Sequence, residues 1–273
     1  MTTHRPISLA HLTVLDTTPP ELVTVAAAAG FRTIGIRLTA TPSVGVPPYS
    51  DDILRDGPLL RETLRRLDDT GVTVLDTEFL RFEPDQPVAI PEGFLEVSAR
   101  LGAQNVLVMS AEPEDARTLD RFCELCDRAA TYGLNVGLEF AIYTGVRTLA
   151  HAAHVVARSK RPNASVLIDA LHFSRSGGLP AHVASVDPSL LRYAQICDAG
   201  PDMPGPGDTP ALVREARTGR LLPGEGVLPL AELVAALPDD APLAIEAPCR
   251  ATADLPAFER AKRAHRALAA LVR

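Results

Sequence analysis

The chain has 273 residues, of which 46% are hydrophobic, and this length suits one α/β barrel that folds as a single unit. Acidic residues outnumber basic ones by 34 to 27, so the net charge of −7 argues against a broad cationic surface for nucleic acid or an anionic membrane. We therefore expect one domain over residues 1–273 and a small-molecule partner.

The amino-terminal stretch MTTHRPISLAHLTVLD has no basic region followed by a clean apolar core, as a secretory signal would have. No later segment reaches the roughly 18 apolar residues of a membrane helix. The four cysteines are too few and too scattered for a disulfide framework in a chain of this length. Together these features predict a cytoplasmic protein.

Segments of strand-like composition alternate with segments of helical periodicity along the chain. Strands are predicted to start at Ile7, Thr33, Val72, Asn105, Asn135, Ser165, Leu191 and Ala241. Helices are predicted at 19–29, 58–69, 91–101, 114–132, 147–159, part of 179–191, 228–237 and 256–272. Such alternation calls for parallel strands with right-handed helical crossovers, and it predicts an α/β fold of the (β/α)8 or TIM barrel type. The proline- and glycine-rich loop at 199–210 should then lie over the catalytic end of the barrel.

Polar side chains end four consecutive predicted strands. Because side chains alternate along a strand, the apolar residues should face the helices, and one oxygen-bearing residue of each strand should face inward near its carboxyl end. These inward residues are Glu139, Asp169, Gln195 and Glu246. The carboxyl ends of barrel strands meet at one mouth, so we expect the four side chains to converge there.

Three carboxylates at one mouth repel one another, and a bound cation is the least costly resolution. With the Gln195 carbonyl oxygen they form an all-oxygen ligand set, which favours Mg²⁺ or Mn²⁺. The alternative is that these residues are strand-end polar groups satisfied by loop amides or by arginines such as Arg37. Their common register on four successive strands favours the metal site.

Other residues are candidates for contacts with a substrate. Arg37 and Glu78 end the second and third predicted strands and either line the pocket or form an ordinary salt bridge. Arg175 follows the sixth strand, where its guanidinium suits a carboxylate, phosphate or hydroxyl. His11 ends the first predicted strand and could reach the pocket.

Three arginines, Arg214, Arg217 and Arg220, precede the motif PGEG. They are interpreted first as a solvated helix face, with contact to substrate as the alternative. PGEG itself is interpreted as a turn in front of a helix, with Glu225 exposed to solvent.

The chain resembles the superfamily of sugar phosphate isomerases and epimerases, the xylose isomerase-like TIM barrels. The matching motifs are GLEF at 137–140, DALH at 169–172, AQICD at 194–198, PGEG at 223–226 and AIEAP at 244–248. The resemblance implies that the four inward residues named above bind a divalent metal ion. It also implies that Glu139 and Glu246 transfer protons and that His172 contacts the substrate.

Gln195 departs from one branch of the family. Ketose epimerases usually carry a histidine at this position, whereas barrels similar to 3-dehydroshikimate dehydratase carry a glutamine. Endonuclease IV, another relative, is disfavoured because Met109 and Glu78 stand where it carries histidines and because this chain is acidic.

The predicted function is a divalent-metal-dependent isomerase or epimerase that removes a proton next to a carbonyl in a small polyhydroxylated substrate, a sugar or cyclitol. A metal-dependent dehydratase, a lyase, is the alternative, because the same enolate loses a β-hydroxyl if one is present. A non-catalytic ligand-binding barrel is less favoured, since the proposed ligands and both proton-transfer carboxylates occur together. Homodimers and homotetramers are common in similar barrels.

Overall fold

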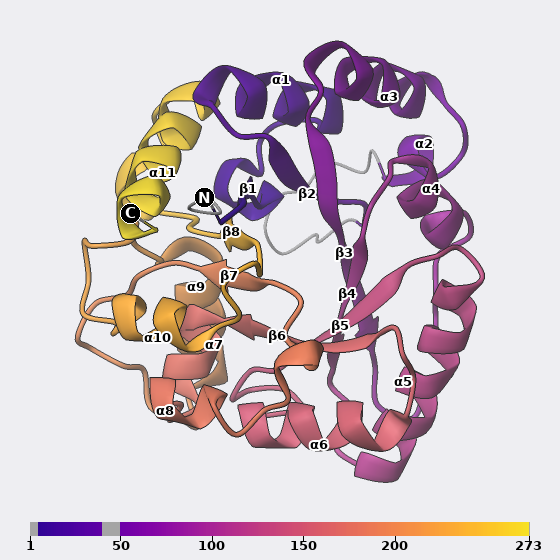
Figure 1. Cartoon of the computed structure of the whole chain (residues 1–273), viewed down its shortest axis with the longest axis vertical. Helices are drawn as coiled ribbons and strands as arrows, with labels where there is room; N and C mark the ends of the chain where they lie inside the picture. Colours follow the sequence, from indigo (N-terminus) through magenta and orange to yellow (C-terminus); the bar gives the residue numbers. More distant parts are fainter. Residues whose placement is uncertain (1–4, 40–49, 273) are drawn as a thin grey trace.

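The computed structural model describes residues 5–39 and 50–272, and its centre is a closed barrel of parallel strands (Figure 1). Each strand pairs with its sequence neighbours, and β8 closes the barrel on β1. The strands are β1 (Ile7–Leu9), β2 (Thr33–Arg37), β3 (Thr73–Phe82), β4 (Asn105–Ser110), β5 (Asn135–Glu139), β6 (Ala164–Asp169), β7 (Ala194–Ile196) and β8 (Leu243–Ile245). This order confirms the predicted TIM barrel.

Helices surround the barrel, and Figure 1 shows α1, α3, α5, α6 and α11 in an outer ring around the strands. The α-helices are α1 (Pro19–Ala29), α2 (Ser50–Ile53), α3 (Pro58–Thr70), α4 (Phe94–Arg100), α5 (Asp115–Ala130), α6 (Leu149–Ser159), α7 (Ala170–Arg175), α8 (Pro180–Val183), α9 (Thr209–Thr218), α10 (Leu230–Ala236) and α11 (Ala257–Leu271). Short 3-10 helices are η1 (His11–Val14), η3 (Pro188–Leu190) and η4 (Arg250–Thr252). None of the helices in these described ranges is long and apolar enough to cross a membrane.

Local sequence signals set the ends of the helices. Helix α1 begins after Thr18, whose backbone N–H donates to the Glu21 carboxylate at 2.8 Å, and Pro19 occupies the first turn, where its missing N–H costs nothing. The same helix ends at Gly30, whose φ of 100° lies in the left-handed region that favours glycine. These signals are why the predicted boundary at 19–29 agrees with the observed helix.

The barrel has two apolar regions. The larger one lies between strands and helices and includes the outward residues of the strands, such as Val136 and Leu138 on β5. The smaller one fills the barrel interior and consists of Ala10, Leu75, Leu107, Met109, Ala141, Leu167, Tyr193 and Ala244. One buried acid, Asp76 of β3, also lies in this interior, where its carboxylate accepts a hydrogen bond from the Tyr193 hydroxyl at 3.0 Å.

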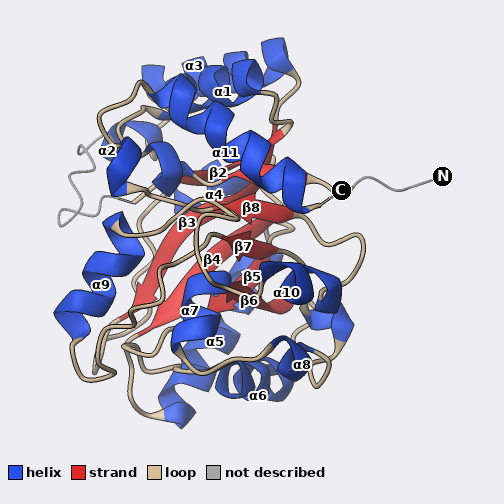
Figure 2. Cartoon of the chain, turned by 90° about the vertical axis from the view of Figure 1, so that its left-hand side faces the viewer, coloured by secondary structure: helices blue, strands red, loops and turns tan. Residues whose placement is uncertain are grey.

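Three predicted segments differ from the structure. The first strand ends at Leu9, and the next turn, His11–Val14, is η1. The sixth strand ends at Asp169, which caps α7, so DALHF continues as helix and not as strand. Helix α9 begins at Thr209, inside the segment predicted as the 199–210 loop. The sequence predicts there only that Arg214, Arg217 and Arg220 share a helix face. Figure 2 shows α9 at the left-hand edge of the molecule.

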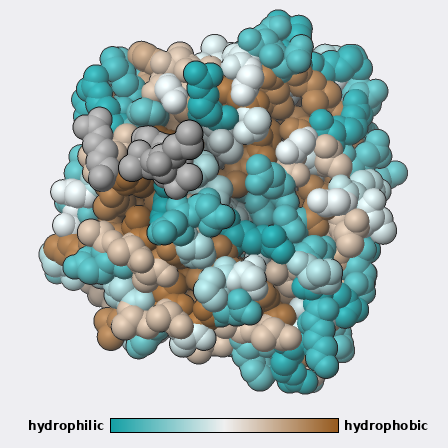
Figure 3. All heavy atoms as spheres, in the orientation of Figure 1, coloured by the Kyte–Doolittle hydropathy of each residue, from teal (hydrophilic) through white to brown (hydrophobic). Residues whose placement is uncertain are grey.

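The face of the molecule seen in Figure 1 has a mixed surface. Figure 3 shows hydrophilic and hydrophobic side chains interspersed on it. Large hydrophobic side chains that are exposed in the described part, such as Tyr132, Leu179 and Val227, come from separate segments of the chain. This distribution agrees with the chain's acidic, mixed composition.

Candidate active site

The four predicted ligands lie where the strands end, and all are buried. Glu139 and Asp169 are the last residues of β5 and β6, and Gln195 pairs in register with Asp169. Glu246 directly follows β8, and its backbone N–H donates to Ile196 O at 3.0 Å. The alternation of side chains along the strands is therefore as predicted.

The motif DALH forms a helix cap. The Asp169 carboxylate accepts a hydrogen bond from the His172 backbone N–H at 2.9 Å, as expected of an aspartate at an N-cap. The His172 side chain lies beside the carboxyl end of β5, with its Nε2 3.9 Å from Glu139 Oε1. Glu139, Asp169 and His172 each offer one ligand atom, and these atoms all lie within 4.8 Å of one another.

Burial shapes the protonation of this cluster. Burial, with repulsion from Asp169 and Glu246, raises the pKa of Glu139 well above its usual value. Burial lowers the pKa of His172 to about 4, with Asp169 acting in the opposite direction, so the imidazole is neutral near pH 7. A neutral imidazole is the form that binds metals.

Arg220 is one of two buried arginines at the site. Its guanidinium forms an ion pair with the Asp169 carboxylate and another with Glu246 Oε2 at 3.0 Å. It also donates to the Glu246 backbone carbonyl at 3.1 Å, while its Nε donates to Ala216 O at 2.7 Å. The first interpretation of Arg220, a solvated helix face, is therefore wrong for this residue.

Arg220 affects the two carboxylates differently. Burial is the largest single influence on Asp169 and opposes its ionisation, but the Arg220 guanidinium, His172 and the hydrogen bonds from both residues together outweigh it and lower the pKa of Asp169. For Glu246, burial dominates over Arg220, and Glu78 and Asp169 add repulsion, so its pKa rises to about 8. Asp169 is therefore a carboxylate at neutral pH, whereas Glu246 is poised to exchange a proton.

Gln195 lies between two acids at the base of the site. Its Nε2 is 3.4 Å from Glu78 Oε1 and 3.4 Å from Glu246 Oε1, so the amide donates to both. Its Oε1 is buried and has no hydrogen-bond partner among the described residues. An unpartnered buried carbonyl oxygen is costly, and a cation or a water molecule would satisfy it.

The donor set fits a divalent cation. Glu139, Asp169 and His172 supply two oxygens and one nitrogen, and each oxygen of Asp169 keeps a second lone pair beside its present hydrogen bond. Five buried carboxyl groups and two buried guanidinium groups interact here, which leaves three negative charges in excess if all are ionised. The groups are Asp76, Glu78, Glu139, Asp169, Glu246, Arg37 and Arg220. His172 joins Glu139 and Asp169 in this group, while the predicted all-oxygen set with Gln195 and Glu246 stays a prediction.

Of the other residues predicted to bind substrate, Arg37 lies at the mouth and Arg175 does not. Arg37 and Glu78 form a buried ion pair at 2.9 Å, and Arg37 also lies over the Phe79 ring at 5.1 Å and lines the mouth. Arg175 instead binds Glu215 at 2.6 Å and Gly200 O at 3.1 Å, joining α7 to α9 and the loop between them. Arg175 is not among the residues that line the mouth, so we leave it out of the proposed binding site.

Asp198, the last residue of the motif AQICD, binds the backbone of the motif PGEG. Its carboxylate accepts hydrogen bonds from the backbone N–H groups of Gly224, Gly226 and Leu228, each at 3.0 Å. A Cβ on Gly226 would lie 2.3 Å from Ala199 O and 2.4 Å from Asp198 Oδ1, so only glycine fits. This arrangement holds the segment directly after Arg220.

His11 does not reach the mouth as a substrate ligand. Its Nδ1 accepts from the Arg37 backbone N–H at 3.1 Å, and its Nε2 lies 2.9 Å from Thr17 O, to which it donates. Burial lowers the pKa of His11 to about 4, partly opposed by the Thr17 carbonyl. The residue therefore fixes the end of β2, and with it Arg37.

We expect His11 to make stability depend on pH. As the pH falls from about 6.5, the unfolded chain takes up a proton at His11 that the folded state accepts only near pH 4, so stability falls by up to about 3 kcal/mol. Urea unfolding at a series of pH values should show a shallower acid dependence for His11→Asn, whose amide oxygen can still accept from Arg37. Equal slopes for the two proteins would contradict the assignment.

The mouth cavity is narrow. Its volume is about 70 Å³, and its lining includes Arg37, Glu139, Tyr143, His172 and Glu246. That volume is the share of about two water molecules, so a sugar needs the lining side chains to move outward. Tyr143 packs edge-on against His172, with ring centroids 5.6 Å apart.

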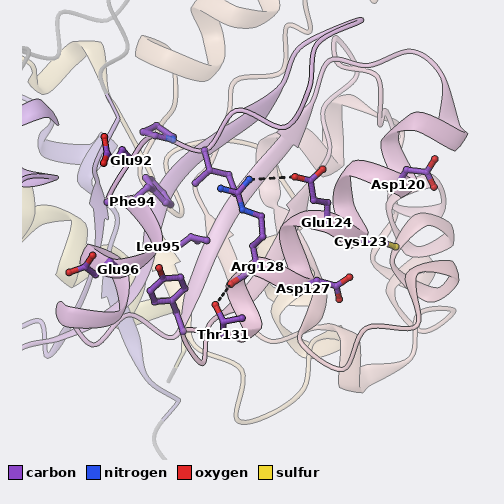
Figure 4. Close-up of a pocket in the computed structure, with 14 residues that line it drawn as sticks. Glu92, Phe94, Leu95, Glu96, Asp120, Cys123, Glu124, Asp127, Arg128 and Thr131 are labelled. Carbon is purple, nitrogen blue, oxygen red and sulfur yellow. Dashed lines mark hydrogen bonds and ion pairs between the residues drawn. The ribbon is translucent and has the colours of Figure 1, made fainter.

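A cavity of about 780 Å³ lies elsewhere, over helices α4 and α5 (Figure 4). Carboxylates predominate among its labelled side chains, and Arg128 pairs with Glu124 at 3.4 Å within it. It contains none of the predicted site residues. We therefore assign the candidate active site to the mouth and not to this outer groove.

The closed barrel and the buried polar cluster at its mouth define the class of protein, a (β/α)8 barrel with its site at the carboxyl ends of the strands. A sequence model of the family described as xylose isomerase-like TIM barrel matches residues 23–271. The chain belongs to this family, so the resemblance drawn from its motifs is confirmed. No curated protein matches the chain.

Solved structures of similar fold agree with this assignment. The IOLI protein with a binding zinc atom has 20% sequence identity and a TM-score of 0.80, and the match covers 98% of each chain. A D-allulose 3-epimerase from Methylomonas sp. has 16% identity and a TM-score of 0.69, again with 98% of each chain covered. A fusion of a xylose isomerase-like TIM barrel with 4-hydroxyphenylpyruvate dioxygenase has 20% identity and a TM-score of 0.80; 97% of this chain covers 42% of that one.

Proposed function

We propose that the protein is a divalent-metal-dependent isomerase or epimerase that removes a proton next to a carbonyl in a small sugar or cyclitol. The observation that carries the proposal is the buried cluster of Glu139, Asp169 and His172 at the mouth, with Glu246 held on the far side of Arg220. We propose Mn²⁺ or Mg²⁺ as the cofactor and favour Mn²⁺, because His172 adds a nitrogen donor to the oxygens.

A cation held by these donors would polarise the substrate carbonyl and lower the cost of removing the α-proton. Glu139 and Glu246 come from β5 and from the residue after β8, three strands further around the barrel, and both line the mouth cavity. One carboxylate can take the proton from one face of the substrate, and the other can return it to the opposite face or to the adjacent carbon. Glu246 has a pKa raised to about 8, which suits it to give as well as take a proton near neutral pH.

Arg37 and Arg220 would orient the substrate's oxygens. Both guanidinium groups line the mouth cavity, and each is held by a carboxylate, Glu78 for Arg37 and Asp169 for Arg220. Cations held in place before the reaction stabilise the negative charge that develops on an enediolate.

Dehydration is the second candidate, and Gln195 favours it. This strand position carries glutamine in barrels similar to 3-dehydroshikimate dehydratase, as the sequence resemblance implies. In a substrate with a β-hydroxyl, Glu246 would be the acid that protonates the departing oxygen, because its pKa is raised to about 8 and it lines the mouth, whereas His172 is neutral and would hold the cation.

Deuterium exchange tests the proposal. We expect the Mn²⁺-loaded protein in heavy water to incorporate deuterium next to the carbonyl of at least one member of a panel of ketoses and inososes, read by mass spectrometry. Loss of water from 3-dehydroshikimate without such exchange would favour the dehydratase. Metal-dependent activity in neither assay would leave the non-catalytic barrel as the better account.

A further inference from the structure

A second cavity adjoins the mouth. It has a volume of about 680 Å³ and lies between η1, α9 and the segment that follows β8. Leu12 and Arg217 line both this cavity and the mouth, so the two share one wall. Pockets that bind small molecules commonly have volumes of about 300–1,000 Å³, and this cavity is within that range.

The charge of this second cavity is opposite to that of the chain. Four arginines line it, Arg214, Arg217, Arg250 and Arg260, together with one carboxylate, Asp16, while the chain as a whole has a net charge of −7. Arg260 forms an ion pair with Asp16, which leaves three positive charges in excess. Excess positive charge beside a narrow mouth attracts anions.

Two of these arginines have side chains without a partner within residues 5–39 and 50–272. The side chains of Arg214 and Arg250 form no hydrogen bond or ion pair there, and both residues are exposed. Arg214 and Arg217 are three residues apart on α9, so they share one face of the helix. Arg260 has a side chain that is only 11% exposed, and its Nε is buried without a hydrogen bond.

The cations also act on one another across the shared wall. Burial lowers the pKa of Arg217, and repulsion from Arg37 and Arg81 lowers it further. Both of those arginines line the mouth. An anion bound between the two cavities would relieve this repulsion.

We propose that the second cavity binds an anionic group, a phosphate or a carboxylate, that is attached to the sugar or cyclitol reacting at the mouth. The inference rests on the proposed function for the identity of the reacting part. Leu15, Val213 and Pro248 give the cavity apolar walls, so it accommodates the carbon skeleton of the anionic part as well as its charge. The arginines supply charge-assisted hydrogen bonds at its rim.

Binding is measured separately from turnover. Inorganic phosphate and acetate are titrated by calorimetry into the full chain and into the double variant Arg214→Gln with Arg250→Gln. A matched control is Arg158→Gln with Arg263→Gln, which removes the same charge from exposed arginines on α6 and α11. We expect one or both anions to bind the wild type and the control, and about 10- to 100-fold weaker binding to the double variant.

Turnover then identifies the source of the anion. Deuterium exchange is measured with D-fructose, D-fructose 6-phosphate and a ketouronate as substrates. The double variant should raise KM for the preferred anionic substrate, relative to the wild type. That rise should be about 10- to 100-fold larger than the rise in KM for the neutral ketose. Equal binding of both anions to all three proteins overturns the inference, whatever the exchange results. Anion binding that needs Arg214 and Arg250, with no exchange from any substrate, supports the cavity and counts against the proposed function.

Discussion

Replacing Glu139 by glutamine should lower the rate of deuterium exchange by about 10³-fold or more while leaving the fold intact. Glu139 is both a proposed donor to the cation and a proposed proton-transfer group, and removing a general base alone commonly costs about 10²- to 10⁴-fold. Because burial already raises the pKa of Glu139, a neutral amide should be tolerated in the metal-free protein.

Two measurements separate catalysis from folding for this variant. The melting temperature without metal should be unchanged or higher, and the stabilisation that Mn²⁺ gives the wild type should be lost. Glu232→Gln, on the exposed face of α10, is the matched control and should retain both exchange and the response to Mn²⁺. Full exchange by Glu139→Gln would remove Glu139 from the proposed mechanism.

Replacing Arg220 by methionine should lower the free energy of unfolding by about 3–5 kcal/mol. The substitution leaves the buried carboxylates of Asp169 and Glu246 without the cation that now pairs with both, and breaking a buried pair on one side typically costs that much. In a chain of this size the melting temperature should fall by roughly 6–20 °C.

The loss in Arg220→Met should depend on pH and on metal. Arg220 lowers the pKa of Asp169, so without it the acid takes up a proton more readily, and the loss should be smaller at about pH 5 than at about pH 8. Mn²⁺ should stabilise the variant more than the wild type, because it supplies the missing positive charge. Arg220→Lys should lose less. Wild-type stability in Arg220→Met would show that the ion pairs are not needed.

The alternation of sequence patterns was sufficient to predict the barrel. Strands and helices of a (β/α)8 fold are local patterns, and the side chains of each strand alternate with a period of two, so the inward positions of Glu139 and Asp169 follow from the strand boundaries alone. Helices α7 and α9 begin within segments predicted to be a strand and a loop, and the short helix α2 lies outside every predicted helix. The Asp169 N-cap in DALH was the local signal for α7.

The role of Arg220 could not be predicted from sequence. An arginine in a helix with other arginines is usually solvated, and only the path of the chain after α9 turns this one into the barrel beside Asp169 and Glu246. Asp198 is a similar case, because its backbone partners in PGEG and at Leu228 lie 26 to 30 residues away. The glycines of PGEG were the one available signal that this segment packs closely against another.

The sequence by itself determined the barrel and the inward residues at the strand ends, because both follow from local periodicity. Only the tertiary structure decided which of those side chains contact one another. It placed His172 with Glu139 and Asp169, turned the Gln195 amide toward Glu78 and Glu246, and directed Arg175 away from the mouth. These outcomes depend on contacts between segments far apart in the chain, where burial and charge act together and no local pattern records them.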